Sequence, residues 1–427
     1  MKRLLLTLAF IASTAFAQQP QTTIVLKAAR LFDGTSDTVT RNATVVIQGH
    51  RIASIGGAIP AGAQVIDLGD VTLLPGFIDS HVHLSAESGD NWYLDWFQTM
   101  MRQPTEQALL ATTYARKTID AGFTTVRDVG SSDYISVGMR NAINNRWIVG
   151  PRMLVANYAI GATGGHGDGD PIPPARNVPQ LGPLQGVCNG SAECRAAVRY
   201  QIKYGADVIK FMPSGGVLSL SDPVDAPELS QDEMNAIVEE AHHWGRRVAA
   251  HCHGDAAARM AIQAGVDSIE HGSFMKPETL AMMRDHGTYL VPTLLAGEWT
   301  GGKADKFPPA IAAKAKAALA ARSDMFRNAL KGGVKIAFGT DSAVSPHGLN
   351  AREFALMTGL GMSSAAALRS ATAVAAALLG IDDRLGTIAT GKVADIVAVP
   401  GNPLDDIHAT EHVVFVMKDG AVVKNTR

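Results

Sequence analysis

The feature that most constrains the fold is a regular alternation of apolar and amphipathic segments between residues 77 and 342. The apolar segments have the length and composition of buried strands, and most segments between them have a helical pattern. Strands that alternate with helices form parallel βα units, and eight such units predict a closed (β/α)8 barrel, the TIM barrel of the α/β class. An open doubly wound sheet would carry a phosphate-binding glycine motif after its first strand, which this sequence lacks. The eight predicted strands are residues 77–84, 124–130, 152–160, 206–212, 246–253, 267–273, 289–295 and 335–342.

The two ends of the chain differ in character from its middle. Residues 22–74 are rich in Val, Ile and Thr in strand-like alternation, with Gly and Asp-Gly turns between the strands. Residues 385–425 repeat this pattern. We therefore expect one small β-sandwich domain built from both chain ends, residues 18–75 and 384–427, and a barrel formed by residues 76–383.

The N-terminus has the pattern of a secretory signal peptide, which we assign to residues 1–17. A basic start, Lys2-Arg3, precedes an apolar run, and a small-residue cleavage site ends at Ala17. No other apolar run is long enough to span a bilayer. We expect an exported protein, periplasmic or secreted after cleavage near Ala17, whose mature chain does not bind the membrane.

Composition narrows the expected partners and the redox environment. The net charge is −2 and no Lys/Arg run stands out, so we expect a small-molecule substrate and no nucleic acid. Cys188 and Cys194 bracket a turn-rich stretch, where an oxidising compartment permits a disulfide, although spacing alone does not establish one. Cys252 lies within an apolar strand and is expected to be a buried small hydrophobe.

Polar residues at the ends of the predicted strands form the clearest functional pattern. Catalytic groups of such barrels lie at the C-terminal ends of the strands, on one rim. Imidazoles and a carboxylate that converge there are ligands for zinc-like divalent metals. A single histidine in an apolar strand is more often a core residue, but this explanation does not account for a whole set. The set comprises His81, His83, Lys210, His251, His253, His271 and Asp341.

Lys210 raises a question of its own, because it interrupts the apolar strand 206–212. Burial of an ammonium group without a partner is costly, and this group has no lone pair for a metal. After reaction with CO₂ the side chain becomes a carbamate, an anion that can bridge two metal ions. The alternative is a lysine paired with a nearby aspartate.

With these residues in place, the sequence resembles the amidohydrolase superfamily with binuclear metal centres. The TGGHG element (163–167) and the 20-residue step from His251 to His271 make it similar to one branch in particular. That branch contains Xaa-Pro dipeptidases, related metallo-carboxypeptidases and ochratoxin-hydrolysing amidases. The matching motifs are LPGFIDSHVHL (74–84), AGFTTVRDVG (121–130), GADVIK (205–210), VAAHCHG (248–254), IEHG (269–272), FGTDS (338–342), HGLNAREFALM (347–357) and LGTIATGKVADIVAV (385–399).

The resemblance implies a homo-oligomer and a site with two divalent metal ions, for which zinc is the expected metal. By resemblance, one metal is held by His81, His83 and Asp341. The other is held by His251 and His271, and Lys210, N-carboxylated by CO₂, bridges the two.

The chemistry that the resemblance implies is attack of a metal-bridging hydroxide on an amide carbonyl. Asp341 would accept the proton of the hydroxide and deliver it to the leaving amine. For stabilising the oxyanion, His253 is the first candidate, because it shares a strand face with His251, and His166 is the second. Asp128 is expected to orient a ligand or Arg127, with a structural ion pair as the alternative.

Loops at the rim should select the substrate. The backbone amides of Gly215, Gly216 and Val217 are candidates for binding a substrate carboxylate, and His347 for closing the site. The aromatic residues of segment 92–97 suggest a pocket for aromatic groups or a subunit interface, with simple helix packing as the alternative.

Together these features predict hydrolysis of an amide that joins an acyl or aminoacyl group to a C-terminal amino acid. Xaa-Pro dipeptides and N-acyl-phenylalanine compounds such as ochratoxin are the precedents in the similar branch. One alternative is a hydrolase that opens a lactone or imidazolone ring with the same hydroxide. A more remote alternative is a non-catalytic scaffold protein, which would have lost the metal ligands that are present here.

Overall fold

The computed structural model describes residues 23–89, 91–169, 172, 174–176, 179–220 and 222–427. The predicted signal peptide, residues 1–17, lies outside the described residues. No helix in the described ranges is both long and apolar enough to cross a membrane.

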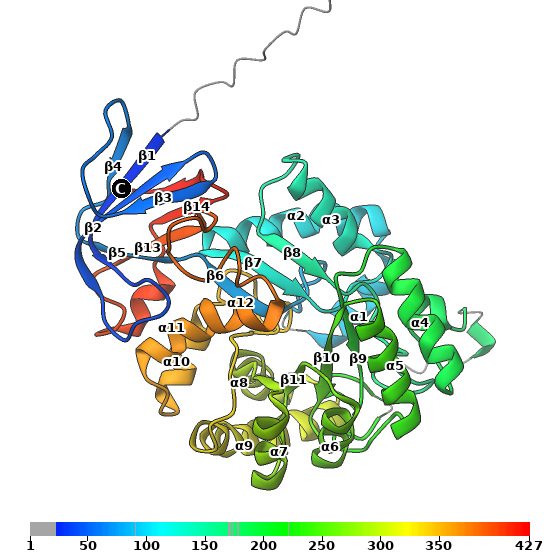
Figure 1. The fold of residues 1–427 in the computed structure, drawn as a ribbon. Helices are drawn as coiled ribbons and strands as arrows, with labels where there is room; N and C mark the ends of the chain where they lie inside the picture. The colour runs from blue at the N-terminus through cyan, green and yellow to red at the C-terminus, as the bar shows by residue number, and fades with distance from the viewer. Residues whose placement is uncertain (1–22, 90, 170–171, 173, 177–178, 221) are drawn as a thin grey trace, which may run out of the picture.

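The centre of the molecule is a set of short parallel strands (Figure 1). One parallel sheet has the order β6-β7-β8 and a second has the order β12-β11-β10-β9. Their residues are almost all buried, because helices cover the outer side and packed side chains fill the inner side. The strands are β6 (Phe77–Val82), β7 (Phe123–Asp128), β8 (Arg152–Val155), β9 (Val208–Phe211), β10 (Arg247–Cys252), β11 (Ser268–His271) and β12 (Tyr289–Val291).

Single parallel bridges connect these two sheets. Ile160 pairs with Phe211, which joins the segment after β8 to β9, and Leu290 of β12 pairs with Ile336. Val82 of β6 pairs with Ser342. The eighth predicted strand, residues 335–342, thus contributes two bridges and no continuous strand. The eight predicted segments are therefore parallel neighbours all the way round.

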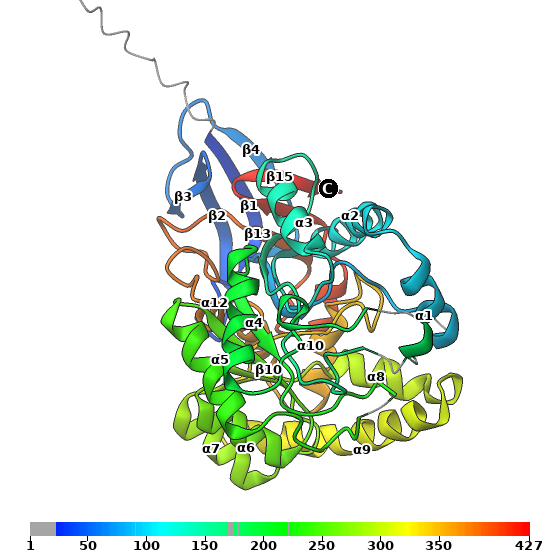
Figure 2. The same ribbon diagram turned by 90° about the vertical axis from the view of Figure 1, so that its right-hand side faces the viewer.

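Helices surround these strands, as the alternating sequence pattern predicts (Figures 1 and 2). Helix α5 shows how one begins: the Ser230 hydroxyl accepts the N–H of Glu233, whose carboxylate in turn accepts the N–H of Ser230 at 2.7 Å. The helices are α1 (Trp92–Met101), α2 (Pro104–Asp120), α3 (Ile135–Asn144), α4 (Ser191–Lys203), α5 (Gln231–His243), α6 (Asp255–Ala264), α7 (Pro277–His286), α8 (Leu294–Gly302), α9 (Pro309–Lys331), α10 (Arg352–Gly359), α11 (Ser364–Ser370) and α12 (Ala373–Leu379).

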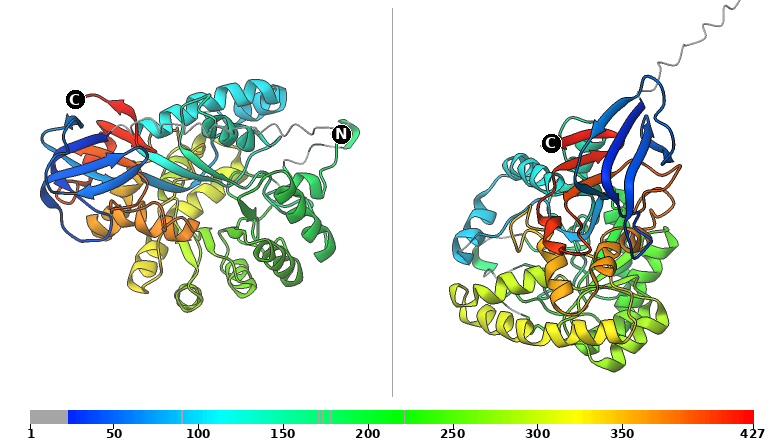
Figure 3. Two further views of the ribbon diagram at one scale, coloured as in Figure 1. Left: turned by 45° about the horizontal axis from the view of Figure 1, so that its top comes forward. Right: turned by 90° about the vertical axis from the view of Figure 1, so that its left-hand side faces the viewer.

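The two chain ends form a separate mixed sheet, in which N-terminal and C-terminal strands combine (Figure 3). Its order is β15-β14-β13-β5-β1-β2-β3, with β4 paired to β1. Strand β5 joins the two halves, because it pairs in parallel with β1 and antiparallel with β13. The prediction of one unit built from both ends is confirmed. Its eight strands form one hydrogen-bonded sheet, whereas we expected the two sheets of a sandwich. The strands are β1 (Thr23–Leu31), β2 (Thr40–Gln48), β3 (Arg51–Ile55), β4 (Gln64–Asp67), β5 (Val71–Pro75), β13 (Ile396–Pro400), β14 (Phe415–Lys418) and β15 (Ala421–Asn425).

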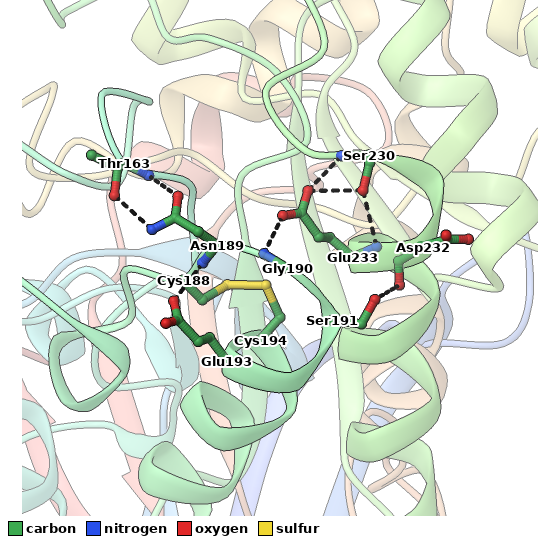
Figure 4. The surroundings of a disulfide bond; sticks show 10 residues. All are labelled: Thr163, Cys188, Asn189, Gly190, Ser191, Glu193, Cys194, Ser230, Asp232 and Glu233. Carbon is green, nitrogen blue, oxygen red and sulfur yellow. Dashed lines mark hydrogen bonds between the residues drawn. A yellow bond between two sulfur atoms is a disulfide. The ribbon is translucent and has the colours of Figure 1, made fainter.

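Cys188 and Cys194 form the disulfide that the sequence left open, with their Cα atoms 5.0 Å apart (Figure 4). Between them, the N–H of Gly190 donates to the Glu233 carboxylate at 2.6 Å. The disulfide loop at the start of α4 is thereby tied to the start of α5. Cys252 is buried and unpaired, as expected.

Candidate metal centre

A cavity of about 190 Å³ lies at the carboxyl ends of the central strands. The side chains that line it come from segments far apart in the sequence, because the carboxyl ends of parallel strands meet on one rim. They include all seven strand-end residues that the sequence singled out, together with His166. The set is His81, His83, His166, Lys210, His251, His253, His271 and Asp341.

Two groups of these side chains have the spacing of metal ligands. Potential ligand atoms of His81, His271 and Asp341 lie within 4.8 Å of one another, and so do those of His251, His253 and His271. Histidine nitrogens and a carboxylate oxygen are the donors that zinc prefers. His253 therefore stands among the possible ligands, whereas we had expected it only beside them.

Most of the imidazoles are held from behind by a second group. Such contacts fix the tautomer and the orientation of a ligand, and they leave Nε2 available for a metal. The contacts join His81 Nδ1 to Glu270 Oε2 at 2.8 Å, His83 Nδ1 to the Gly130 carbonyl at 2.9 Å, His253 Nδ1 to Ser273 Oγ at 2.9 Å, and His271 Nδ1 to Thr293 Oγ1 at 2.7 Å.

The charges of these groups also suit a metal. Burial lowers the pKa of His81 to about 4 and that of His253 to about 3, and it holds the pKa of His271 well below its usual range. These rings are therefore neutral at pH 7 and keep a lone pair for coordination. Burial raises the pKa of Asp341, but His81 and His83 outweigh it and hold this pKa at about 2, so the carboxylate is ionised.

Lys210 lies among these ligands without an acidic partner. It is 1% exposed, and its Nζ lies 3.4 Å from His81 Nε2. Among the described residues, no carboxylate lies within ion-pair distance of Nζ, so the alternative of a lysine paired with an aspartate is not observed. Burial lowers the pKa of Lys210 to about 8, which enlarges the fraction of free amine, the form that reacts with CO₂.

Glu270 and Arg127 form a buried ion pair beneath the histidines, at 2.7 Å. Both side chains are at most 1% exposed, and Arg127 also donates to the Ser80 carbonyl and to Ser268 Oγ. Burial raises the pKa of Glu270, but Arg127 and then His81 outweigh it and hold this pKa at about 2. We did not single out Glu270 from the sequence; its signal was an acidic residue inside an apolar strand, like the lysine at 210.

The backbone bends sharply where these strands end. His271, Thr293 and Asp341 have φ values of 69°, 48° and 57°, in the left-handed region that non-glycine residues rarely adopt. Because of the bend at His271, two consecutive residues lie against the ring of His81. Glu270 contacts its Nδ1, and the ring centroid of His271 lies 5.0 Å from that of His81. Such strained positions cluster at functional sites.

Asp128 acts on His83 through the backbone. Its carboxylate accepts the N–H of Leu84 at 2.8 Å and that of Gly130 at 3.4 Å, and the Gly130 carbonyl holds His83. Burial raises the pKa of Asp128 to about 6. Asp128 thus lies behind His83, as expected of a residue that orients a predicted ligand, and no ion pair with Arg127 is observed within the described residues.

His166 packs against the ring of His251, with the centroids 4.5 Å apart. The ring Nδ1 of His166 lies 3.0 Å from Ser219 Oγ, and the backbone N–H of His166 donates to the Glu228 carboxylate. A Cβ at Gly216 would collide with the ring of His166, so a glycine is needed at that position.

Two predicted substrate contacts, Gly216 and His347, are placed differently from our expectation. The N–H of Gly216 donates to Asp222 Oδ2 at 2.6 Å and is not free for a carboxylate. The Gly215 carbonyl faces His251 Nε2 at 3.3 Å, and of the predicted trio Val217 lines the cavity. His347 is directed away from the cavity, because its Nε2 donates to the Ala86 carbonyl at 2.8 Å and its ring stacks on Tyr114.

The aromatic segment is divided between two environments. Trp92 and Trp96 stack and line a second cavity of about 200 Å³, which shares Leu218, Thr300 and Val344 with the first. Tyr93 and Phe97, the residues that follow them on α1, are exposed. Trp92 and Trp96 thus line a cavity beside the main one, and a pocket for aromatic groups remains a prediction.

This fold, with a cluster of histidines, a lysine and an aspartate at the strand ends, defines a hydrolase of the metal-dependent type. The chain belongs to the amidohydrolase family, whose model matches residues 72–424. It is 32% identical over 412 residues to an ochratoxinase from Aspergillus niger, covering 90% of this chain and 83% of that protein.

Solved structures give the same assignment. A structure of a Xaa-Pro dipeptidase with bound methionine in the active site has a TM-score of 0.90 and 42% identity, covering 95% of this chain and 100% of that one. A prolidase complexed with N-methylphosphonate-L-proline has a TM-score of 0.86 and 32% identity, with the same coverage. The chain is thus an amidohydrolase that resembles prolidase and ochratoxinase and that acts on C–N bonds.

Proposed function

We propose that this protein is a binuclear-metal amide hydrolase that releases a C-terminal amino acid from dipeptides or N-acyl amino acids. The observation that carries this proposal is Lys210, a buried cation that has no acidic partner in the part of the chain that the structure describes. It lies among neutral imidazoles and an ionised aspartate. A carbamate between two metal ions is the arrangement in which burial of this side chain is compensated.

The residues would divide between two divalent ions, for which zinc is our expectation. His81, His83 and Asp341 would hold one, His251 and His271 the other, and N-carboxylated Lys210 would bridge them. When bound, the metals supply a water of lowered pKa and polarise the carbonyl of the substrate.

Asp341 is the residue placed to handle the proton. Its Oδ1 lies 3.3 Å from His83 Nε2 and 3.5 Å from His81 Nε2, and its low pKa keeps the carboxylate ready to accept a proton. It would pass this proton to the leaving amine. His253 and His166, on the same side of the cavity, would stabilise charge that develops on the carbonyl oxygen.

The form of the cavity favours a small substrate with an apolar residue. Its volume of about 190 Å³ is below the roughly 300–1,000 Å³ of sites for drug-sized ligands. Met212, Val217, Leu218, Ala296 and Val344 contribute apolar walls. Similarity to a Xaa-Pro dipeptidase and to an ochratoxinase supports C-terminal amino acids as the leaving group.

We also propose that the protein is exported, to the periplasm or the medium, and acts as a homo-oligomer. The disulfide between Cys188 and Cys194 supports an oxidising compartment.

The test is mass spectrometry of a substrate panel after incubation with the zinc-loaded mature protein and with a chelated control. The panel holds Xaa-Pro and Xaa-Phe dipeptides, N-acyl-phenylalanines including ochratoxin, lactones and an imidazolone. We expect chelator-sensitive release of a C-terminal amino acid. If only the lactones or the imidazolone are opened, the protein is a ring-opening hydrolase and the proposed substrate class is wrong. Binding of less than one metal ion per chain would support a non-catalytic scaffold.

A further inference from the structure

Arg322 forms part of the cavity wall on the side of helices α8 and α9. It lies on α9 one turn after Ala318, and both residues line the cavity. Its Nη1 donates to the carbonyl of Leu294, the first residue of α8. The residue before it is Thr293, whose hydroxyl contacts His271. Two consecutive residues, Thr293 and Leu294, therefore connect the candidate metal centre with the guanidinium of Arg322.

The guanidinium of Arg322 has unused donors. Its Nε is buried and has no hydrogen-bond partner, and the bond to Leu294 is the only one it makes among the described residues. Two acids, Glu353 and Glu298, lie near enough to favour its charge, but neither forms an ion pair with it among the described residues. Glu353 instead accepts the N–H groups of Leu294 at 2.8 Å and Leu295 at 2.6 Å, and Glu298 lies 3.9 Å from Arg352. A guanidinium has five N–H donors and remains charged in proteins, so this one is a half-buried cation with free donors.

Gly297 makes room for this group. A glycine inside a helix costs about 1 kcal/mol relative to alanine, so its presence calls for a reason. A Cβ at Gly297 would collide with Nη1 of Arg322 and would lie 3.0 Å from its Cδ. The glycine thus lets the guanidinium lie against α8, beside the cavity.

A role limited to bridging two helices does not account for these features. The bond to the Leu294 carbonyl uses one donor, and a neutral side chain could provide it without burying a charge. The cavity wall otherwise consists largely of apolar side chains and of the metal-site residues. A charged group at this position is therefore available to an anion that enters with the substrate.

We propose that Arg322 binds a carboxylate of the leaving amino acid and positions its amide bond over the metal centre. The inference rests on the proposed function. Guanidinium and carboxylate form paired, charge-assisted hydrogen bonds that fix orientation as well as contribute affinity. The apolar walls then receive the rest of the residue. We assign this role to Arg322 and not to the backbone amide of Gly216, because the N–H of Gly216 already donates to Asp222.

The carboxylate can be the α-carboxylate or one on the side chain, and three substrates separate these sources. N-acetyl-L-phenylalanine carries only the α-carboxylate, N-acetyl-L-glutamic acid α-amide carries only the side-chain carboxylate, and N-acetyl-L-phenylalaninamide carries neither. The kinetics on each substrate are measured for the wild type, R322M and R322K. The control is R327M, at an exposed site of the same helix, where Arg327 pairs with Asp324.

For the α-carboxylate, we expect R322M to raise KM for N-acetyl-L-phenylalanine about 10- to 100-fold with a smaller change in kcat. R322K should recover part of this loss, and the uncharged amide should respond little. The same pattern with the glutamic acid α-amide alone would assign the side-chain carboxylate. Equal kinetics of R322M and R327M on both acids would overturn the inference.

A binding measurement separates this inference from the proposed function. Calorimetry compares L-phenylalanine with phenethylamine, which lacks the carboxylate, in the metal-loaded wild type, R322M and R327M. If none of the amides is hydrolysed but R322M alone binds L-phenylalanine at least about 10-fold more weakly, the proposed function fails and the role of Arg322 stands. G297A, which displaces the guanidinium but keeps its charge, should weaken the same binding. Unchanged affinity in both variants would contradict the inference.

Discussion

Two buried cations in neighbouring layers of the strand ends behave in opposite ways. Arg127, 1% exposed, has its donors satisfied by Glu270, the Ser80 carbonyl and Ser268. Lys210, also 1% exposed, has a single polar contact among the described residues, with the ring nitrogen of His81 at 3.4 Å. The polar groups around Arg127 thus satisfy one another, whereas the charge of Lys210 has no counter-charge in contact among the described residues. Satisfied polar groups therefore mark the support of this site, and unsatisfied ones mark its function.

This difference has an energetic meaning. Removal of one partner from a buried ion pair leaves a charge that costs about 3–5 kcal/mol. Removal of a buried charge that has no partner relieves such a cost. Substitutions in the two layers should therefore separate stability from activity.

The largest effect is expected for Lys210→Ala. Because the proposed bridge between the metals would be lost, activity should fall by more than about 10⁴-fold and metal content should fall below that of the wild type. The free energy of unfolding of the metal-free protein should not decrease. Metal analysis, kinetics and urea unfolding test this, with Lys316→Ala as the surface control. Short carboxylic acids should restore some activity, and full activity without them would exclude the carbamate.

Asp341→Asn tests the rim without removing the bridge. The amide keeps the size of the carboxylate but is not a base, so kcat should fall about 10²- to 10⁴-fold while much of the metal is retained. The measurement is steady-state kinetics beside metal analysis, with the exposed Asp324→Asn as its control. An unchanged kcat would rule out Asp341 as the group that transfers the proton.

Glu270→Gln tests the support layer. The charge of Arg127 remains buried without its partner, so the free energy of unfolding of the metal-free protein should fall by about 3–5 kcal/mol. Metal affinity should fall about 10- to 100-fold, because His81 loses the group that orients it. The double variant Glu270→Gln/Arg127→Met should recover stability but not metal affinity. Wild-type stability of the single variant would show that the two layers do not differ in this way.

Glu353 is a buried acid, and it extends the comparison of the two buried cations to a buried group of the opposite kind. Burial raises its pKa to about 8 from the usual 4.5, so folding favours its protonated form. Its stabilising contribution is complete below pH 4.5 and is lost as the pH rises through 8. As the pH rises over this range, the free energy of unfolding of the wild type should therefore fall relative to that of Glu353→Gln. Urea unfolding at several pH values measures the slope, and a pH-independent difference would contradict it.

Much of this site could be predicted because its residues carry local signals. His81, His83, Lys210, His251, His253, His271 and Asp341 each interrupt or end an apolar strand, and the strand ends of a parallel barrel meet at one rim. The sheet of the chain ends was predictable for a similar reason, since its strands alternate at both ends of the sequence.

The remainder depends on contacts that leave no local pattern. Arg127 and Glu270 are 143 residues apart, and their pairing follows only from the completed fold. Strand alternation also fails at His271, where the left-handed bend brings Glu270 and His271 to the same ring. Arg322 lies in an alanine-rich helix without any motif, and the glycine that accommodates it is on another helix.

The mixed sheet makes the order of synthesis matter. Strand β5 needs β13 on one edge, and the ribosome produces β13 only after the whole barrel. Until then β5 has an unpaired edge, which is a template for aggregation, and contacts of such long sequence separation form slowly. Completion of the sheet is therefore expected to be the last event of folding. A chain cut short before β13 would have a complete set of metal ligands and yet remain a target for chaperones and proteases.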